Sequence, residues 1–285
     1  MLKRIITAIV ALIVFIPILI FSNTWVFPAA MALASFIGCY EMLKCIGQKK
    51  NIWLALPIYV LAAAFPLLTR AFYLSYPDKG SAFTELLTLA MGVFLVLAVY
   101  IFGVAVFANK RISVPDAGLI FATVSYTVAA FSTIVYVHDY IDHGKYIYLL
   151  VFICAWMTDS FAYFTGRLFG KHKLIPSVSP KKTVEGAIGG IVFCVISTVV
   201  FGLIIEKFFI PGQSANYLVL AISGVFISVV SQTGDLIMSV IKRHYGIKDY
   251  GIMFPGHGGI LDRFDSVMAV SIILSFICTY FNMFA

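Results

Sequence analysis

Four aspartates in the C-terminal half of the sequence lie in or directly beside long apolar stretches: Asp159, Asp235, Asp262 and Asp265. An ionised aspartate inside a membrane span costs about 2.5–3.5 kcal/mol on insertion scales, so it normally faces a wet cavity and has a function. Oxygen ligands without a cysteine or histidine cluster favour a hard cation, Mg²⁺ or Mn²⁺, over zinc. Carboxylates with lysine and arginine around such a cation are what a phosphoryl-type transfer requires.

The carboxylate of Asp235 belongs to a polar stripe on an otherwise apolar helix. Ser231, Asp235, Ser239 and Lys242 follow one another at steps of four, four and three residues, so they share one helical face. A stripe of this kind can also hold helices together without any catalytic role. The density of polar groups favours a functional face.

Asp159 opens a second helical face that continues through Tyr163 to Gly166 and Arg167. A packing role for a buried Asp159, paired with a basic residue, is the alternative to a site residue. We expect Asp159 and Arg167 to bind substrate.

A basic segment follows, with Ser179 and Pro180 before Lys181 and Lys182. Serine then proline is typical of an N-cap and the first helical residue, so we predict a helix start at Ser179. Two lysines beside the free N–H groups of a helix start would suit a phosphate group. Taken alone, however, this segment is better explained by the basic bias of cytoplasmic loops.

The last polar segment runs from Lys248 to Asp265 and is rich in glycine. Glycine lets the backbone approach a ligand closely, which suggests a role for Gly258 and Gly259. His257 could act as a base or pack as a neutral group. Asp262 and Asp265 lie on one face at a helix start, where capping would explain either residue but not both together with Asp235.

The elements that must position these residues are membrane helices. The chain of 285 residues is 61% hydrophobic and only 12% charged, with a mean hydropathy of +1.00. Uninterrupted apolar runs indicate helices and not barrel strands, so the fold class is an all-α, polytopic integral membrane protein. The five scattered cysteines suggest neither zinc nor disulfides. We predict nine spans, at 5–22, 24–43, 52–69, 83–107, 113–137, 146–165, 186–205, 216–240 and 265–284.

The basic residues predict the orientation of these spans. With the N-terminus in the cytoplasm, sixteen Lys and Arg residues fall inside and four outside, and the C-terminus lies outside. We divide the chain into scaffold helices at 1–140, nearly without buried polar groups, and a catalytic region at 141–285 with cytoplasmic loops at 166–185 and 241–264. The alternative of a cleaved signal peptide at the N-terminus is disfavoured by the length of its apolar run.

The segment from Ser239 to Asp265 resembles the signature of the phosphatidate cytidylyltransferase (CDP-diacylglycerol synthase) family. All of its fixed positions are filled over 27 consecutive residues. The segments around Asp159, Ser179 and Asp235 also resemble family motifs, so the likeness spans roughly 150–270.

The resemblance implies a reaction of CTP with phosphatidate that gives CDP-diacylglycerol and pyrophosphate and requires Mg²⁺. It implies metal binding by Asp235 and Asp262, with a monovalent cation such as K⁺ near the same pair. It also implies a homodimer in the inner membrane, with a site open to the cytoplasm, and no nucleic-acid partner. The residues that we expect to act in catalysis are Asp235, Asp262, Asp265, Lys242 and Arg263, and those that we expect to bind substrate are Asp159, Arg167, Ser179, Lys181, Lys182, Arg243, Lys248, Asp249, His257, Gly258 and Gly259.

Three other functions are compatible with parts of this pattern. A polyprenol kinase or an archaeal-type lipid cytidylyltransferase would also use CTP at a membrane. A cation-coupled transporter would explain intramembrane aspartates, but it would place its charges near the midplane and show two mirrored halves. Here the charges gather towards one membrane face.

Overall fold

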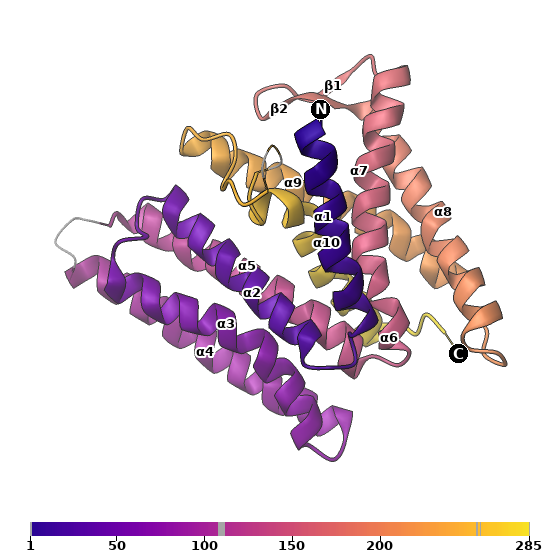
Figure 1. Cartoon of the computed structure of the whole chain (residues 1–285), viewed down its shortest axis with the longest axis horizontal. Helices are drawn as coiled ribbons and strands as arrows, with labels where there is room; N and C mark the ends of the chain where they lie inside the picture. Colours follow the sequence, from indigo (N-terminus) through magenta and orange to yellow (C-terminus); the bar gives the residue numbers. More distant parts are fainter. Residues whose placement is uncertain (1, 108–111, 255, 257, 285) are drawn as a thin grey trace. The chain divides into compact units, whose positions relative to one another are not determined.

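The computed structural model describes residues 2–107, 112–254, 256 and 258–284; within the first helix it describes the side chains of residue 7 and of residues from 9 onward (Figure 1). Long helices dominate this part of the chain, and each predicted span falls on one of them. Their bounds are α1 (Leu2–Ile20), α2 (Val26–Cys45), α3 (Ile52–Ser75), α4 (Lys79–Phe107), α5 (Val114–Tyr140), α6 (Gly144–Ile147), α7 (Leu149–Phe169), α8 (Val184–Phe208), α9 (Tyr217–His244) and α10 (Leu261–Tyr280).

Seven stretches in the described part of the chain are long and apolar enough to cross a membrane. They are α2, α3, α4, α5, α6 with α7, α8 and α9. The class of multi-pass helical membrane protein is thereby confirmed. The count of nine spans and the orientation of the termini stay predictions, because α1 contributes only the shorter apolar stretch Ile9–Ile20 and α10 is not among the seven.

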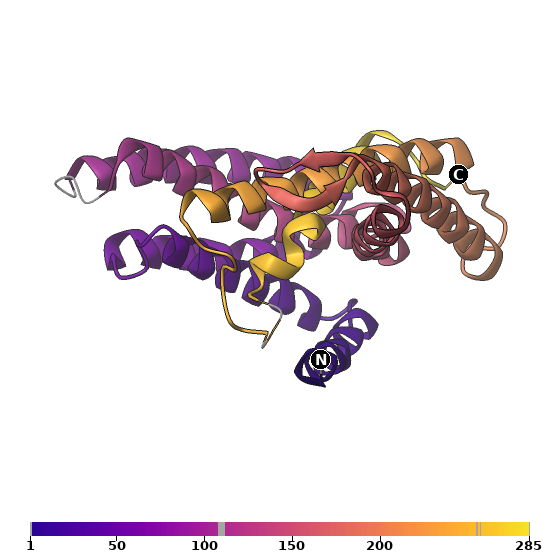
Figure 2. The same cartoon turned by 90° about the horizontal axis from the view of Figure 1, so that it is seen from above.

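The first of two compact units contains Met1–Tyr140 together with Ile247–Arg263. Its helices α2, α3, α4 and α5 pack against one another, as Figure 2 shows from a second direction. The contact is close where α2 presents Gly38. A Cβ atom there would lie 3.0 Å from Cγ2 of Thr127 on α5 and 3.2 Å from Cδ2 of Leu261.

The second unit contains Ile141–Gly246 and Phe264–Ala285, with α8 packed between α7 and α9. Small residues on α8 make the contact with α7 possible. A Cβ atom on Gly186 would lie 2.6 Å from the carbonyl oxygen of Ala162, and one on Gly190 would lie 3.0 Å from the carbonyl oxygen of Thr158. Membrane helices commonly use such residues to bring their backbones together.

A short antiparallel hairpin interrupts the otherwise helical fold between α7 and α8. Strand β1 (Lys173–Ile175) pairs with β2 (Ser179–Thr183), so the all-α class needs this addition. The predicted helix start at Ser179 is wrong. The N-cap of α8 is Thr183, which is extended and accepts a hydrogen bond of 3.1 Å from the backbone N–H of Gly186. A two-stranded sheet consists of edge strands, where Pro180 is tolerated.

The basic residues of the second predicted loop are also placed differently from the expectation. Helix α9 continues to His244, so Lys242 and Arg243 belong to its last turn and not to a loop beginning at residue 241. Their positive charges therefore lie at the helix end that carries the negative partial charge of the macrodipole.

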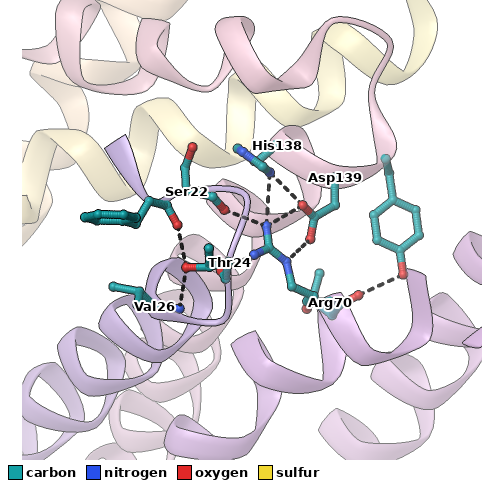
Figure 3. Close-up of polar contacts among 9 residues, drawn as sticks. Ser22, Thr24, Val26, Arg70, His138 and Asp139 are labelled. Atoms are coloured by element: carbon teal, nitrogen blue, oxygen red, sulfur yellow. Dashed lines mark hydrogen bonds and ion pairs between the residues drawn. The ribbon is translucent and has the colours of Figure 1, made fainter. Parts of the chain in front are cut away.

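The scaffold helices contain more buried polar groups than predicted, and Figure 3 shows one cluster of them. Arg70 near the end of α3 donates to both carboxylate oxygens of Asp139 on α5, at 2.8 and 2.6 Å. The guanidinium also donates to the carbonyl oxygens of Ser22 and Thr24 in the turn between α1 and α2. His138 Nδ1 lies 2.6 Å from the same carboxylate. One buried cation thus connects the α1–α2 turn, α3 and α5.

We expect Arg70→Met to lower the free energy of unfolding by about 3–5 kcal/mol, because Asp139 would then be a buried carboxylate without its cation. Thermal unfolding of the detergent-solubilised protein measures the change. The double variant Arg70→Met/Asp139→Leu removes both charges and should unfold at a higher temperature than Arg70→Met alone. Equal unfolding temperatures for the wild-type protein and Arg70→Met would contradict this account.

Candidate active site

A lysine from the hairpin and a carboxylate from α9 form the centre of a polar cluster in the second unit. Lys182 Nζ lies 2.6 Å from Asp235 Oδ2, and each side chain is 26% exposed. Alternation along β2 explains why Lys182 makes this contact while Lys181 is exposed. Sequence reasoning proposed a role for both lysines without separating them.

Two further carboxylates surround this pair. The carboxyl groups of Asp235 and Asp265 interact directly, and Asp265 is also within electrostatic reach of Asp159 and Lys242. The cluster thus combines three carboxylates and two lysines that come from α7, β2, α9 and α10. Its carboxylates outnumber its lysines, which suits the binding of an additional cation.

Hydroxyl groups on α9 and α10 orient the carboxylates of the cluster. Ser266 donates from Oγ to Asp159 Oδ2 at 2.8 Å, and its backbone N–H donates to Asp265 Oδ1 at 2.9 Å. Ser239 donates from Oγ to Asp235 Oδ1 at 3.4 Å, as its place one turn along the predicted stripe would suggest. The carboxylate oxygens are therefore held in defined directions.

The residues that support this cluster were missed from the sequence. Thr158 on α7 donates to Ser228 on α9 at 3.1 Å, and Gln232 donates to the carbonyl oxygen of Ala187 on α8 at 3.2 Å. Together they connect α7, α8 and α9. Gln232 and Ser228 lie three and seven residues before Asp235, so extending the polar stripe towards the N-terminus of the helix would have found them.

The fit of these residues to a magnesium ion can be judged from the donor set. In the described part of the chain, no group of three or more His, Cys, Asp or Glu side chains is arranged to hold a metal ion. Magnesium, however, is usually bound through one or two protein carboxylates, with water and substrate phosphates completing its shell. The neighbouring carboxylates of Asp235 and Asp265 fit that requirement.

Asp262 lies in the first unit, where it binds the glycine-rich loop, by which we mean the described residues 248–254 and 258–260 before α10. Its Oδ2 accepts hydrogen bonds from the backbone N–H groups of Tyr250 at 2.7 Å and Gly259 at 2.9 Å. Gly258 has φ of +91°, and a Cβ atom there would lie 2.7 Å from the same oxygen. Asp262 therefore holds the backbone that precedes α10, and its pairing with Asp235 in a metal site stays a prediction.

The remaining predicted site residues fall into three groups. Ser179 is partly buried in β2, and His257 lies outside the described residues. Arg167 donates to the hydroxyl of Tyr163 at 3.4 Å, which confirms that these two side chains share a helical face. The predicted site residues with exposed side chains are Asp159, Arg167, Lys181, Arg243, Lys248, Asp249 and Arg263.

Comparison with known proteins accounts for almost the whole length of the chain. Residues 2–281 match the model of the cytidylyltransferase family. The chain belongs to the cytidylyltransferase family. This cytidylyltransferase is 35% identical to a phosphatidate cytidylyltransferase of Staphylococcus saprophyticus, over 94% of the chain and 95% of that relative. The proteins of the same name in Staphylococcus haemolyticus and Staphylococcus aureus strain COL are 36% and 31% identical over the same shares.

The resemblance drawn from the segment between Ser239 and Asp265 is therefore confirmed. The match also includes the first five long helices, for which the sequence alone suggested only a general membrane character. The family match therefore covers the scaffold helices as well as the helices that carry the polar cluster.

The close approach of α7 and α8, which positions β2 and Lys182, gives a testable expectation. We expect Gly186→Ala to lower the free energy of unfolding by about 1–3 kcal/mol through overpacking against Ala162. Gly103→Ala on α4 is the control, because a Cβ atom there would meet nothing within 4 Å. Thermal unfolding should show a loss for Gly186→Ala and none for Gly103→Ala; equal behaviour of the two variants would contradict the packing argument.

Proposed function

We propose that this protein is a phosphatidate cytidylyltransferase that converts CTP and phosphatidate to CDP-diacylglycerol and pyrophosphate. The observation that carries this proposal is the match along nearly the whole chain to relatives of that name, at 31–36% identity. The polar cluster around Lys182 and Asp235 supports it, because the cluster combines the charges that a transfer between phosphates requires.

The chemistry needs positioning more than it needs a strong base. A phosphate oxygen of phosphatidate attacks the α-phosphorus of CTP and forms the new P–O bond. The bond from the α-phosphorus to the bridging oxygen breaks, and its electrons leave with pyrophosphate. Because the attacking oxygen is already anionic at neutral pH, holding the two phosphates in line and neutralising charge account for the rate.

The lysines of the cluster are the groups that neutralise charge. Lys182 and Lys242 lie near the carboxylates of Asp235 and Asp265, where a phosphate group would compete for their charge. Asp235 and Asp265 would hold Mg²⁺, with Asp262 as the further ligand that the family resemblance implies. When bound, Mg²⁺ would polarise phosphate oxygens and offset the charge of the leaving group.

The exposed basic residues extend this role to the rest of the substrates. Arg243, Lys248 and Arg263 are exposed and available for the triphosphate or the departing pyrophosphate. Arg167 is exposed as well, and we expect it to bind the other phosphate. We propose that the site faces the cytoplasm, because the bias of basic residues favours that side of the cell membrane. We also propose that the protein is a homodimer and that K⁺ binds near the carboxylates.

Pyrophosphate release by the purified protein tests the proposed function. We expect release from CTP only when both phosphatidate and Mg²⁺ are present. A panel of lipid acceptors that includes a polyprenol and an archaeal-type ether lipid tests the choice of substrate. Equal or faster reaction with one of these acceptors would refute phosphatidate as the substrate.

Asp235→Asn should lower the turnover number by at least about a hundredfold, the loss expected when one preorganised electrostatic contact is removed. Glu206→Gln is the matched control, because this carboxylate accepts hydrogen bonds from Tyr217 and from the backbone of Ala215, away from the cluster. Both variants should insert into the membrane and purify like the wild-type protein. Near-normal turnover by Asp235→Asn would refute its assignment to the metal site.

The two adjacent lysines of β2 give a second matched comparison. Lys182→Met should lower turnover by about a hundredfold, because it removes the cation that lies 2.6 Å from Asp235. Lys181→Met should change turnover by less than about threefold, since its charge is exposed and well solvated. The measurement is the rate of pyrophosphate release at saturating CTP. Equal losses of turnover in the two variants would contradict the conclusion that alternation along β2 gives the two lysines different roles.

A further inference from the structure

Glu41 is a buried carboxylate on α2, four residues before the end of the helix. Only 4% of the residue is exposed. A buried carboxylate costs several kcal/mol unless hydrogen bonds and charges compensate for the lost water. Its partners therefore indicate why the chain retains it.

These partners lie more than two hundred positions away in the sequence, at the start of α10. Glu41 Oε1 accepts from the backbone N–H of Ile260 at 3.1 Å, and Oε2 accepts from that of Leu261 at 2.9 Å. The N–H groups at a helix start have no partner within the helix, and negative charge is favourable there. Glu41 thus caps α10 from another helix and uses both of its oxygens to do so.

The glycine-rich loop is shaped to admit this carboxylate. A Cβ atom on either Gly251 or Gly259 would overlap with the carboxylate of Glu41. Glycine is therefore required at both positions so that Glu41 can approach the backbone closely. This is a more specific requirement than the conformational freedom that glycine gives to any loop.

The same loop is bound from its other end by Asp262. Asp262 takes the N–H groups of Tyr250 and Gly259, while Glu41 takes those of Ile260 and Leu261. Three consecutive N–H groups, 259–261, thus have carboxylate acceptors. The position of Asp262 is determined by the loop conformation that Glu41 fixes.

We propose that Glu41 is a positioning residue for the cytidylyl transfer: it fixes the glycine-rich loop and the start of α10, and through them Asp262. This inference rests on the proposed function. Glu41 itself does not touch substrate, and it acts through the backbone that it holds. A misplacement of about 1 Å in a reacting group lowers turnover by about a hundredfold. A carboxylate in a scaffold helix is therefore part of what makes the C-terminal segment active.

Glu41→Gln tests the contact directly. The amide keeps the size of the side chain but offers one acceptor oxygen, and its NH₂ group would face a backbone donor. We expect hydrogen–deuterium exchange in a peptide covering 258–262 to accelerate about tenfold, because N–H groups bonded to a charged acceptor lose that protection. Ser35→Ala is the control: Ser35 is fully buried in the same helix, and its hydroxyl has no hydrogen-bond partner among the described residues.

Kinetics separate a positioning role from a merely structural one. We expect Glu41→Gln to lower kcat for pyrophosphate release about ten- to a hundredfold and to leave KM for phosphatidate within about twofold. Thermal unfolding of this variant should stay close to that of Ser35→Ala. For Glu41→Gln, faster exchange at 258–262 with unchanged kcat would overturn the proposal. Faster exchange in all peptides together with a lower unfolding temperature would also overturn it, because the effect would then be a general loss of structure.

The two proposals fail in different ways. A wild-type protein that releases no pyrophosphate would refute the proposed function. Unchanged exchange at residues 258–262 in Glu41→Gln would refute the positioning role, whatever the substrate is.

Discussion

A charge among apolar helices has no water to solvate it, and it is tolerated only where another element supplies a partner. This constraint determines where the elements of each unit meet. In the first unit it brings the turn between α1 and α2 to Arg70 and the start of α10 to Glu41. In the second unit it brings strand β2 to Asp235 on α9. Apolar packing brings helices together, and these contacts select which faces and which ends meet.

Two clusters of charged residues differ in how completely their charges are paired and in how exposed they are. This difference separates a structural cluster from a candidate site. The Arg70 guanidinium donates to the carboxylate of Asp139 and to two backbone carbonyls, and both side chains are only 5% exposed. No room is left there for a ligand. Lys182 and Asp235 are each 26% exposed, although the Nζ atom of Lys182 is itself buried against the carboxylate. The most completely paired cluster is thus structural, and the partly exposed one is the better candidate for substrate binding.

Features that depend on local composition were predictable from the sequence. The helices follow from apolar runs, and Asp159, Asp235 and Asp265 are recognisable because a carboxylate in such a run is costly. The hairpin was missed because serine followed by proline is typical of a helix start, whereas here Thr183 caps the helix four residues later. Glu41 also lies inside a predicted span, but its role was missed because its partners are 219 and 220 residues away. A contact between distant segments leaves no periodic pattern in either of them.

The two carboxylates at the start of α10, Asp262 and Asp265, are three residues apart and make different contacts. Asp262 accepts from backbone N–H groups of the loop before it, whereas Asp265 interacts with Asp235. Asp262 directly follows the start of this helix. Anchoring that start to Glu41 in a scaffold helix limits how far Asp262 can shift.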